Sequence, residues 1–212
     1  MLERGTVKEL IDQSLSKGIF GEGFEFRAGQ REVIEAICNH YIEDPQGTII
    51  LDAPTGSGKS LIAMWSSHIL KEMGNRGYLV TSDLMLQDQY EEDFKRLKLN
   101  WPSIRGVDNY TCNVNDLPFS LADCKMKGIG YEAAEKLKCW GTCGYLQGRR
   151  RAKELPVALF NYSYYLIQRN YVEDKMQEQD REVPFPKRDF VFFDEAHKVD
   201  SIVQSHFSPR ID

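Results

Sequence analysis

A short glycine-rich stretch, residues 53–60, carries the clearest chemistry in this 212-residue sequence. It follows the apolar run 48–52 directly and precedes a segment with helical spacing of apolar residues. Glycines let backbone N–H groups turn toward phosphate oxygens, and a helix N-terminus adds its positive dipole end. A lysine and a hydroxyl at the end of such a loop reach the β- and γ-phosphates and Mg²⁺. The stretch therefore predicts a phosphate-binding loop, and the alternative is a glycine-rich turn with a chance lysine.

The residue types within this loop suggest individual roles. Lys59 is expected to hold phosphate, and Ser60 is expected to bind Mg²⁺. The loop begins with Ala53 where the strict pattern has glycine, so the match is imperfect. The predicted nucleotide-binding residues are Pro54, Thr55, Gly56, Ser57, Gly58, Lys59 and Ser60.

Two adjacent carboxylates end the apolar run 190–193 near the other end of the sequence. In open α/β sheets, ligands bind at the carboxyl ends of the strands. Asp194 therefore suits the Mg²⁺ shell, and Glu195 suits a base that orients an attacking water. We predict Glu195, Asp194 and Lys59 as the catalytic residues. The alternative is an acidic strand end followed by an ordinary surface histidine, His197.

Gln30 lies shortly before the predicted phosphate-binding loop, at the start of an expected helix over 31–37. Its side-chain amide has both a donor and an acceptor, so it can pair with the edge of adenine. Arg27 or Phe26 is positioned in sequence to stack on such a ring. Without the neighbouring motifs, the segment indicates no more than the start of a helix.

Four cysteines occur in one stretch of the chain, at Cys112, Cys124, Cys139 and Cys143, with 11, 14 and 3 residues between them. No histidine lies among them, and four thiolates in a short segment are typical of a metal centre. Zinc sites usually contain pairs of cysteines with two residues between them, which this stretch lacks, so an iron–sulfur cluster is favoured over zinc. Unliganded cysteines are the third alternative. Cys38 lies apart, on an apolar helix face, and is predicted to belong to the core.

Alternating strand and helix patterns indicate an α/β fold with a parallel sheet that positions these groups. The rhythm breaks between about 101 and 154, where the four cysteines lie, and this stretch is predicted to be an insert. Expected strands cover 48–52, 78–81, 157–161 and 190–194. Expected helices cover about 59–73, 84–97 and 162–171.

The formal net charge is −5, but residues 105–154 hold nine lysines and arginines against six acidic residues. A basic insert on an acidic body can meet a nucleic-acid backbone locally. The candidates for a single-strand path are Lys136, Lys138, Arg149, Arg150, Arg151 and Lys153, with Tyr110, Trp140 and Tyr145 for base stacking. The alternative is a solvated helix face with aromatic packing around the cysteines.

No apolar run approaches the length of a membrane span. Val7, Leu10, Ile11 and Leu15 have helical spacing near the N-terminus, which indicates a helix face and not a signal peptide. We therefore expect a cytoplasmic protein in a reducing compartment, with no membrane partner.

The order of these motifs resembles the XPD/DinG family of superfamily 2 DNA helicases, over about residues 20–200. The similarity rests on Gln30, on the loop 53–60, and on the segments 81–89, 105–112, 143–149, 157–161 and 194–197. It implies a RecA-like core, a 4Fe–4S cluster on the four cysteines, and a 5′→3′ motor on single-stranded DNA. It also implies that Gln30 reads adenine, and that Lys59, Ser60, Asp194 and Glu195 hold and hydrolyse ATP-Mg²⁺.

The resemblance divides the chain into a RecA-like helicase domain 1 at residues 1–100 and 155–212, and an iron–sulfur insert at 101–154. The family's arch domain and second RecA-like domain, which bears an arginine finger, are not found within residues 1–212. We therefore expect a monomeric fragment that binds nucleotide and single-stranded or forked DNA with little turnover. Two alternatives stay open: a non-helicase P-loop ATPase with a zinc-stabilised insert, and a nucleic-acid-binding module with a vestigial ATP site.

Overall fold

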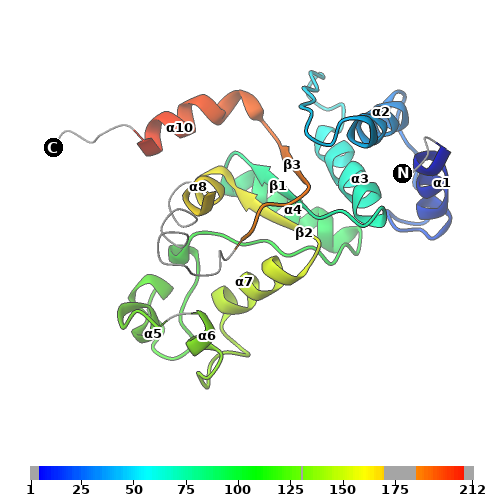
Figure 1. Ribbon diagram of the computed structural model, residues 1–212. Coiled ribbons are helices and arrows are strands. Elements are labelled where there is room, and N and C mark those ends of the chain that lie inside the picture. Colours follow the sequence, from blue (N-terminus) through cyan, green and yellow to red (C-terminus); the bar gives the residue numbers. More distant parts are fainter. Residues whose placement is uncertain (1–4, 130, 170–184, 208–212) are drawn as a thin grey trace.

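The protein is an α/β structure built on three parallel strands, as a computed structural model shows (Figure 1). The structure describes residues 5–129, 131–169 and 185–207. The strands are β1 (Gly77–Thr81), β2 (Val157–Asn161) and β3 (Phe190–Phe193), in the order β2-β1-β3. Leu79 in the central strand lies opposite Leu159 and Phe192. Three of the four expected strands therefore form the sheet.

Helices and short turns connect these strands. The longer helices are α1 (Gly5–Ser16), α2 (Gln30–Glu43), α3 (Lys59–Glu72), α4 (Leu84–Arg96), α7 (Gly144–Glu154), α8 (Tyr162–Ile167) and α10 (Val199–Phe207). The stretch that holds the cysteines contains shorter elements: η1 (Val107–Asn109), η2 (Phe119–Leu121), α5 (Asp123–Met126) and α6 (Tyr131–Ala134). A further turn, η4 (Ala196–Lys198), follows β3. The predicted helices are confirmed within a few residues, except that α8 is shorter and the last two residues of 162–171 lie outside the described ranges.

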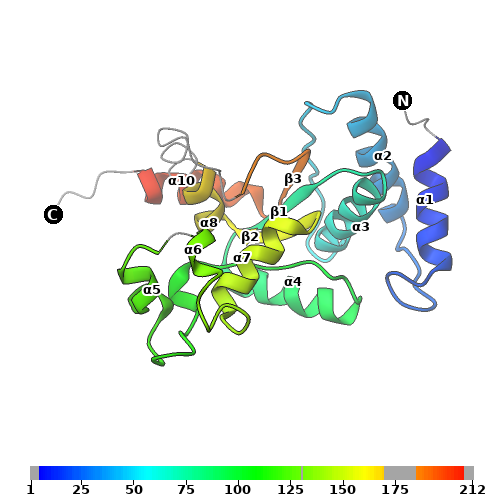
Figure 2. The ribbon, with the colours of Figure 1, turned by 60° about the horizontal axis from the view of Figure 1, so that its bottom comes forward.

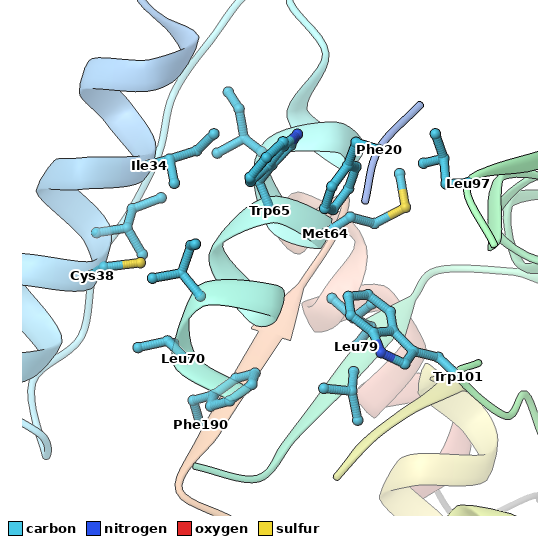
Figure 3. Packing of buried hydrophobic residues seen from close by; sticks show 14 of the residues in the cluster. Phe20, Ile34, Cys38, Met64, Trp65, Leu70, Leu79, Leu97, Trp101 and Phe190 are labelled. Atoms are coloured by element: carbon cyan, nitrogen blue, oxygen red, sulfur yellow. The ribbon is translucent and has the colours of Figure 1, made fainter. Parts of the chain in front are cut away.

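Alternate side chains of the strands enter two different cores, as the pleat of a sheet requires. Leu79, Leu159 and Phe190 face the first core, where helices α1 to α4 pack. Figure 3 shows this core, in which the ring of Phe20 stacks on Trp65 with centroids 4.0 Å apart. The first core fixes α3, the helix that follows the glycine-rich loop.

The second core lies on the opposite face of the sheet, where Tyr78, Val80 and Phe160 point. It also contains buried side chains of the cysteine-bearing stretch, among them Tyr145 and Leu146 of α7. Figure 2 shows α7 lying beside β2, with which it is in contact. The cysteine-bearing stretch therefore shares its core with the sheet and covers one face of it.

Side-chain caps mark the beginning of two helices, α4 and α8. Asp83 precedes α4 and accepts a hydrogen bond from the Leu86 N–H at 2.9 Å. Asn161 precedes α8 and accepts one from the Tyr164 N–H at 2.8 Å. Such caps satisfy N–H groups that the first helical turn leaves without partners. Asn161 is the last residue of β2, and Asp83 lies two residues after the end of β1, so each strand end lies close to the start of the next helix.

Arg188 joins the beginnings of two strands just before β3. Its guanidinium donates to the carbonyls of Gly77 at 2.9 Å and Pro156 at 3.1 Å, and it lies 4.3 Å from the centre of the Tyr78 ring. Burial lowers the pKa of Arg188 to about 10. This contact aligns the amino ends of β1 and β2.

The predicted strand 48–52 is wrong. In the structure this segment has no regular secondary structure, and Ile49 and Ile50 are 44% and 89% exposed. A short apolar run has no period that distinguishes a buried strand from an extended surface segment. The segment still leads directly into the glycine-rich loop.

Candidate nucleotide-binding site

The glycine-rich loop has the backbone geometry that its sequence predicts. Gly56 and Gly58 have φ angles of 82° and 84°, in the left-handed region that glycine adopts without a steric penalty. Gly58 is the residue directly before α3, so the N–H groups of the first turn of α3 follow the loop. A Cβ at Gly58 would lie 2.5 Å from Nε2 of Gln30. Glycine is therefore needed here both for φ and for close approach.

Lys59 folds back over the loop to which it belongs. Its ammonium donates to the carbonyl of Ala53 at 2.8 Å and of Pro54 at 3.3 Å. Pro54, Thr55 and Gly56 are exposed around it. A positive charge thus lies at the mouth of a loop rich in glycine and at the start of a helix, an arrangement suited to anions.

The loop and the acidic strand end meet at Asp194. Ser60 Oγ donates to Asp194 Oδ2 at 3.3 Å, and the Tyr90 hydroxyl donates to the same oxygen at 2.8 Å. The Glu195 N–H donates to the other oxygen, Oδ1, at 2.9 Å. A serine hydroxyl and a carboxylate side by side are oxygen ligands of the kind that Mg²⁺ takes, so the donor set fits this ion.

Glu195 has a left-handed backbone, with φ 58°, which is uncommon for a residue with a Cβ. Its carboxylate Oε2 lies 3.3 Å from Nε2 of His197, and the His197 side chain is 70% exposed. Unusual backbone angles often mark functional positions, because the surrounding structure must hold them. The two carboxylates therefore differ in their partners. Asp194 accepts three hydrogen bonds, whereas Glu195 lies beside an exposed histidine.

Gln30 and Arg27 contact the glycine-rich loop directly. Gln30 is 4% exposed; its Oε1 accepts from the Arg27 N–H at 2.9 Å, and its Nε2 donates to the Ser57 carbonyl at 2.9 Å. Arg27 donates from its guanidinium to the Gly56 carbonyl at 2.7 Å. A pocket of about 500 Å³ opens beside these residues, and Gly58 and Ser60 also line it. Both ends of the Gln30 amide are thus engaged with the protein, each with one further hydrogen-bonding position.

Two tyrosines at this site were not foreseen as functional residues. Tyr90 lies within the helix expected over 84–97, and its hydroxyl contacts the Asp194 carboxylate. Burial and the adjacent Asp194 charge raise the pKa of Tyr90 well above its ordinary value. Tyr162 donates to the backbone carbonyl of Asp194 at 3.1 Å. No sequence signal reveals either contact, because each joins segments far apart in the chain.

Lys198 connects the segment after Asp194 with the end of β1. Its ammonium lies 3.2 Å from the Ser82 hydroxyl and 3.4 Å from Asp83 Oδ2. The Asp83 pKa is lowered, chiefly by the backbone N–H of Leu86 and then by Ser82 and Lys198. Asp83 therefore stays charged while it caps α4.

All five cysteines are free thiols. Cys112 and Cys143 are buried in the second core, and Cys124 and Cys139 are half-buried. Burial raises the pKa of Cys124 and of Cys143, and nearby thiols of the same set raise both further. Cys38 is fully buried in the first core, as predicted, and burial raises its pKa to about 12.

In the part of the chain that the structure describes, no three or more His, Cys, Asp or Glu residues are placed to hold one metal ion. The four thiols therefore suit an iron–sulfur cluster in type but do not form a preformed cage in position.

The candidate residues for a nucleic-acid path lie on and around α7. Tyr145 is 6% exposed and packs against Phe119 and Tyr110, with ring centroids 4.6 and 5.3 Å away, so the packing alternative holds for it. Arg151 bonds to Asn100 at 2.6 Å. The exposed candidates include Lys136, Lys138, Arg150 and Arg151.

Within the described ranges, no helix is long and apolar enough to cross a membrane. Residues 23–205 match the model of the ResIII family, described as the type III restriction enzyme, res subunit. No match was found among curated proteins. The matched range includes the loop 53–60, the acidic strand end and the whole cysteine-bearing stretch. The parallel sheet is consistent with a RecA-like helicase domain, and the chain belongs to the ResIII family, with an ATP-binding domain of the superfamily 2 helicase type.

Proposed function

We propose that residues 1–212 form the nucleotide-binding half of an ATP-driven DNA helicase of the XPD/DinG type. The observation that carries the proposal is the contact between Ser60 and Asp194, which brings the glycine-rich loop and the acidic strand end together at 3.3 Å. A loop for phosphate and a carboxylate for the metal are useful to an NTPase only when they lie side by side. The family match supports the same class of activity.

In this proposal Lys59 pairs with the β- and γ-phosphates, and Ser60 and Asp194 bind Mg²⁺. Glu195 orients the attacking water and takes its proton while the bond between the γ-phosphorus and the β-phosphate oxygen breaks. Gln30, with Arg27 beside it, recognises adenine. It uses the one donor position and the one acceptor position of its amide that its contacts within the protein do not occupy. Mg²⁺ supplies charge stabilisation at the phosphates when bound.

The proposed domain division places the RecA-like helicase domain 1 at residues 1–100 and 155–212, and the cluster insert at 101–154. The single-stranded or forked DNA partner would follow the basic surface of α7. Hydrolysis and 5′→3′ unwinding require a second RecA-like domain, which acts together with residues 1–212. The four cysteines of the insert would have to draw closer together to bind a 4Fe–4S cluster, since no three of them form a metal-binding group in this structure.

The direct test is nucleotide binding by the 212-residue chain with a fluorescent ATP analogue. Lys59→Ala should remove most of the affinity, because it deletes the charge at the loop mouth. The matched control is Lys71→Ala, on the same helix, where the ammonium pairs with Glu72 and not with the loop. Equal affinity of the Lys59→Ala and Lys71→Ala variants would overturn the proposed site.

A further inference from the structure

Tyr90 is a buried tyrosine whose hydroxyl ends at the proposed metal site. It lies on α4, is 1% exposed, and its ring packs edge-on against Phe94 with centroids 6.0 Å apart. Its hydroxyl lies 2.8 Å from Asp194 Oδ2. An ionised carboxylate only accepts hydrogen bonds, so the hydroxyl must donate. A buried core residue thus directs a fixed donor at one oxygen of one carboxylate.

Among the described residues, two side chains reach this oxygen, and the contact from Tyr90 is the shorter. The Ser60 hydroxyl donates to Oδ2 from 3.3 Å. A serine hydroxyl rotates freely to suit its partners, whereas the position of a tyrosine hydroxyl is set by a rigid ring. The Glu195 N–H fixes the other oxygen at 2.9 Å. Tyr90 therefore determines the orientation of the carboxylate more strongly than Ser60 does.

Helix α4 is attached to the same segment at a second point. Asp83, which caps α4, accepts a hydrogen bond from Lys198 at 3.4 Å, four residues beyond Asp194 in the chain. The middle of α4 is attached to Asp194 through Tyr90. The two contacts join the beginning and the middle of α4 to the segment that carries Asp194, and the buried Tyr90 contact is the one that reaches the carboxylate itself.

We propose that Tyr90 is the positioning residue for the metal-binding carboxylate, and that its hydroxyl keeps Asp194 turned toward Ser60. The inference rests on the proposed function, since it assigns a determinant of Mg²⁺ binding at the same site. Tyr90 acts through Asp194 and does not itself contact nucleotide or metal. Removing its hydroxyl leaves the phosphate loop intact and frees the carboxylate to rotate away.

The test compares nucleotide affinity of the 212-residue chain with Mg²⁺ and with EDTA, using a fluorescent ATP analogue. Tyr90→Phe should reduce the gain in affinity that Mg²⁺ provides by about tenfold, because hydrogen bonds to charged groups have effects of that size. Affinity in EDTA should stay as in the unmodified chain. The matched control is Tyr41→Phe. It removes a partly buried hydroxyl that is hydrogen-bonded to Asn75 at 2.9 Å, away from the site.

A second measurement separates orientation of Asp194 from a general loss of packing. In an Asp194→Asn background, Tyr90→Phe should have no further effect on the ratio of the two affinities, since the carboxylate that it positions is gone. A normal Mg²⁺ gain in Tyr90→Phe, or an equal loss in both backgrounds, would overturn the inference and leave the proposed function standing. If the unmodified chain itself gained no affinity from Mg²⁺, the proposed function would fail, and the inference with it.

Discussion

The side-chain amide of Gln30 donates to the backbone carbonyl of Ser57 across 2.9 Å, so the residue expected to read adenine also holds the phosphate loop. The same amide accepts from the Arg27 N–H, and a Cβ at Gly58 would strike it. Base recognition and loop conformation are therefore linked through one buried side chain. A change at Gln30 is expected to act on both.

Gln30→Ala should weaken binding of both ATP and GTP, because each needs the loop that Gln30 holds. The loss should be larger for ATP by a factor of about five to ten, since only adenine gains from the amide. Titration of both nucleotides against the unmodified chain and the variant measures the two effects separately. Equal losses for ATP and GTP would mean that Gln30 supports the loop and does not read the base.

The cysteines of the insert should hold iron. Purified without oxygen, the chain should be brown and contain about four irons and four acid-labile sulfides, as a cluster with four cysteine ligands implies. Replacing any one of Cys112, Cys124, Cys139 or Cys143 with serine should bleach it. Cys38→Ser is the control and should not, because Cys38 lies in the first core. Stoichiometric zinc without sulfide would contradict this prediction and favour the zinc-stabilised insert.

His68 should make the fold sensitive to acid. Its Nε2 lies 2.9 Å from the hydroxyl of Ser14, which itself donates to the Leu10 carbonyl, so Nε2 carries the proton that it donates. Burial lowers the pKa of His68 from 6.5 to about 4. Between these values the unfolded chain binds a proton that the folded chain does not, so stability falls as pH falls.

The expected loss is about 2–3 kcal/mol of unfolding free energy between pH 7 and pH 4. Urea unfolding at several pH values measures it. His68→Gln should flatten this part of the pH profile, whereas His197→Gln, at a histidine whose side chain is 70% exposed, should leave it unchanged. The same pH dependence in His68→Gln as in the unmodified chain would show that another group is responsible.

Gly77 starts the central strand where the Phe190 ring crosses it. A Cβ at Gly77 would overlap three carbons of that ring, and Phe190 is itself buried in the first core. Gly77→Ala should therefore lower the unfolding free energy by about 1–3 kcal/mol, as overpacking does. Gly106→Ala is the control, because its Cβ would meet only Asn109, at 3.6 Å. Chemical denaturation of both variants compares them, and similar midpoints would contradict the packing seen here.

The sequence reveals local features of this site better than contacts between distant segments. The phosphate loop was predictable because its glycines, lysine and following helix lie within a few consecutive residues. The contacts from Tyr90 and Tyr162 to Asp194 were not, because an aromatic residue on a helix face has the same pattern whether it packs or donates a hydrogen bond. The prediction of a strand at 48–52 was wrong for a related reason: composition alone does not determine whether an apolar run pairs with other strands in a sheet. The second core also joins the cysteine-bearing stretch to the sheet, which no spacing rule indicates.

Residues 1–212 should bind ATP but hydrolyse it only at a background rate. Hydrolysis needs charge stabilisation at the γ-phosphate beyond what Lys59 and Mg²⁺ supply, and an arginine finger from a second domain is typically worth about 10³–10⁵ in rate. Such a group contributes only when a rigid framework positions it. In this structure Arg27, which lines the pocket, is already bonded to the Gly56 carbonyl and so holds the loop.

Adding a second RecA-like domain, in cis or in trans, should restore ATPase activity that single-stranded DNA stimulates. In that complete motor Glu195→Gln should keep nucleotide binding and abolish turnover, because it removes the base and keeps the shape.

DNA binding by residues 1–212 should weaken with added salt and with loss of charge at Arg149, Arg150 and Arg151, as contacts to a phosphate backbone do. Phosphate release by purified residues 1–212 measures whether their ATP hydrolysis stays at the background rate. Robust DNA-dependent turnover by residues 1–212 as a monomer would contradict that expectation and identify a self-sufficient P-loop ATPase instead.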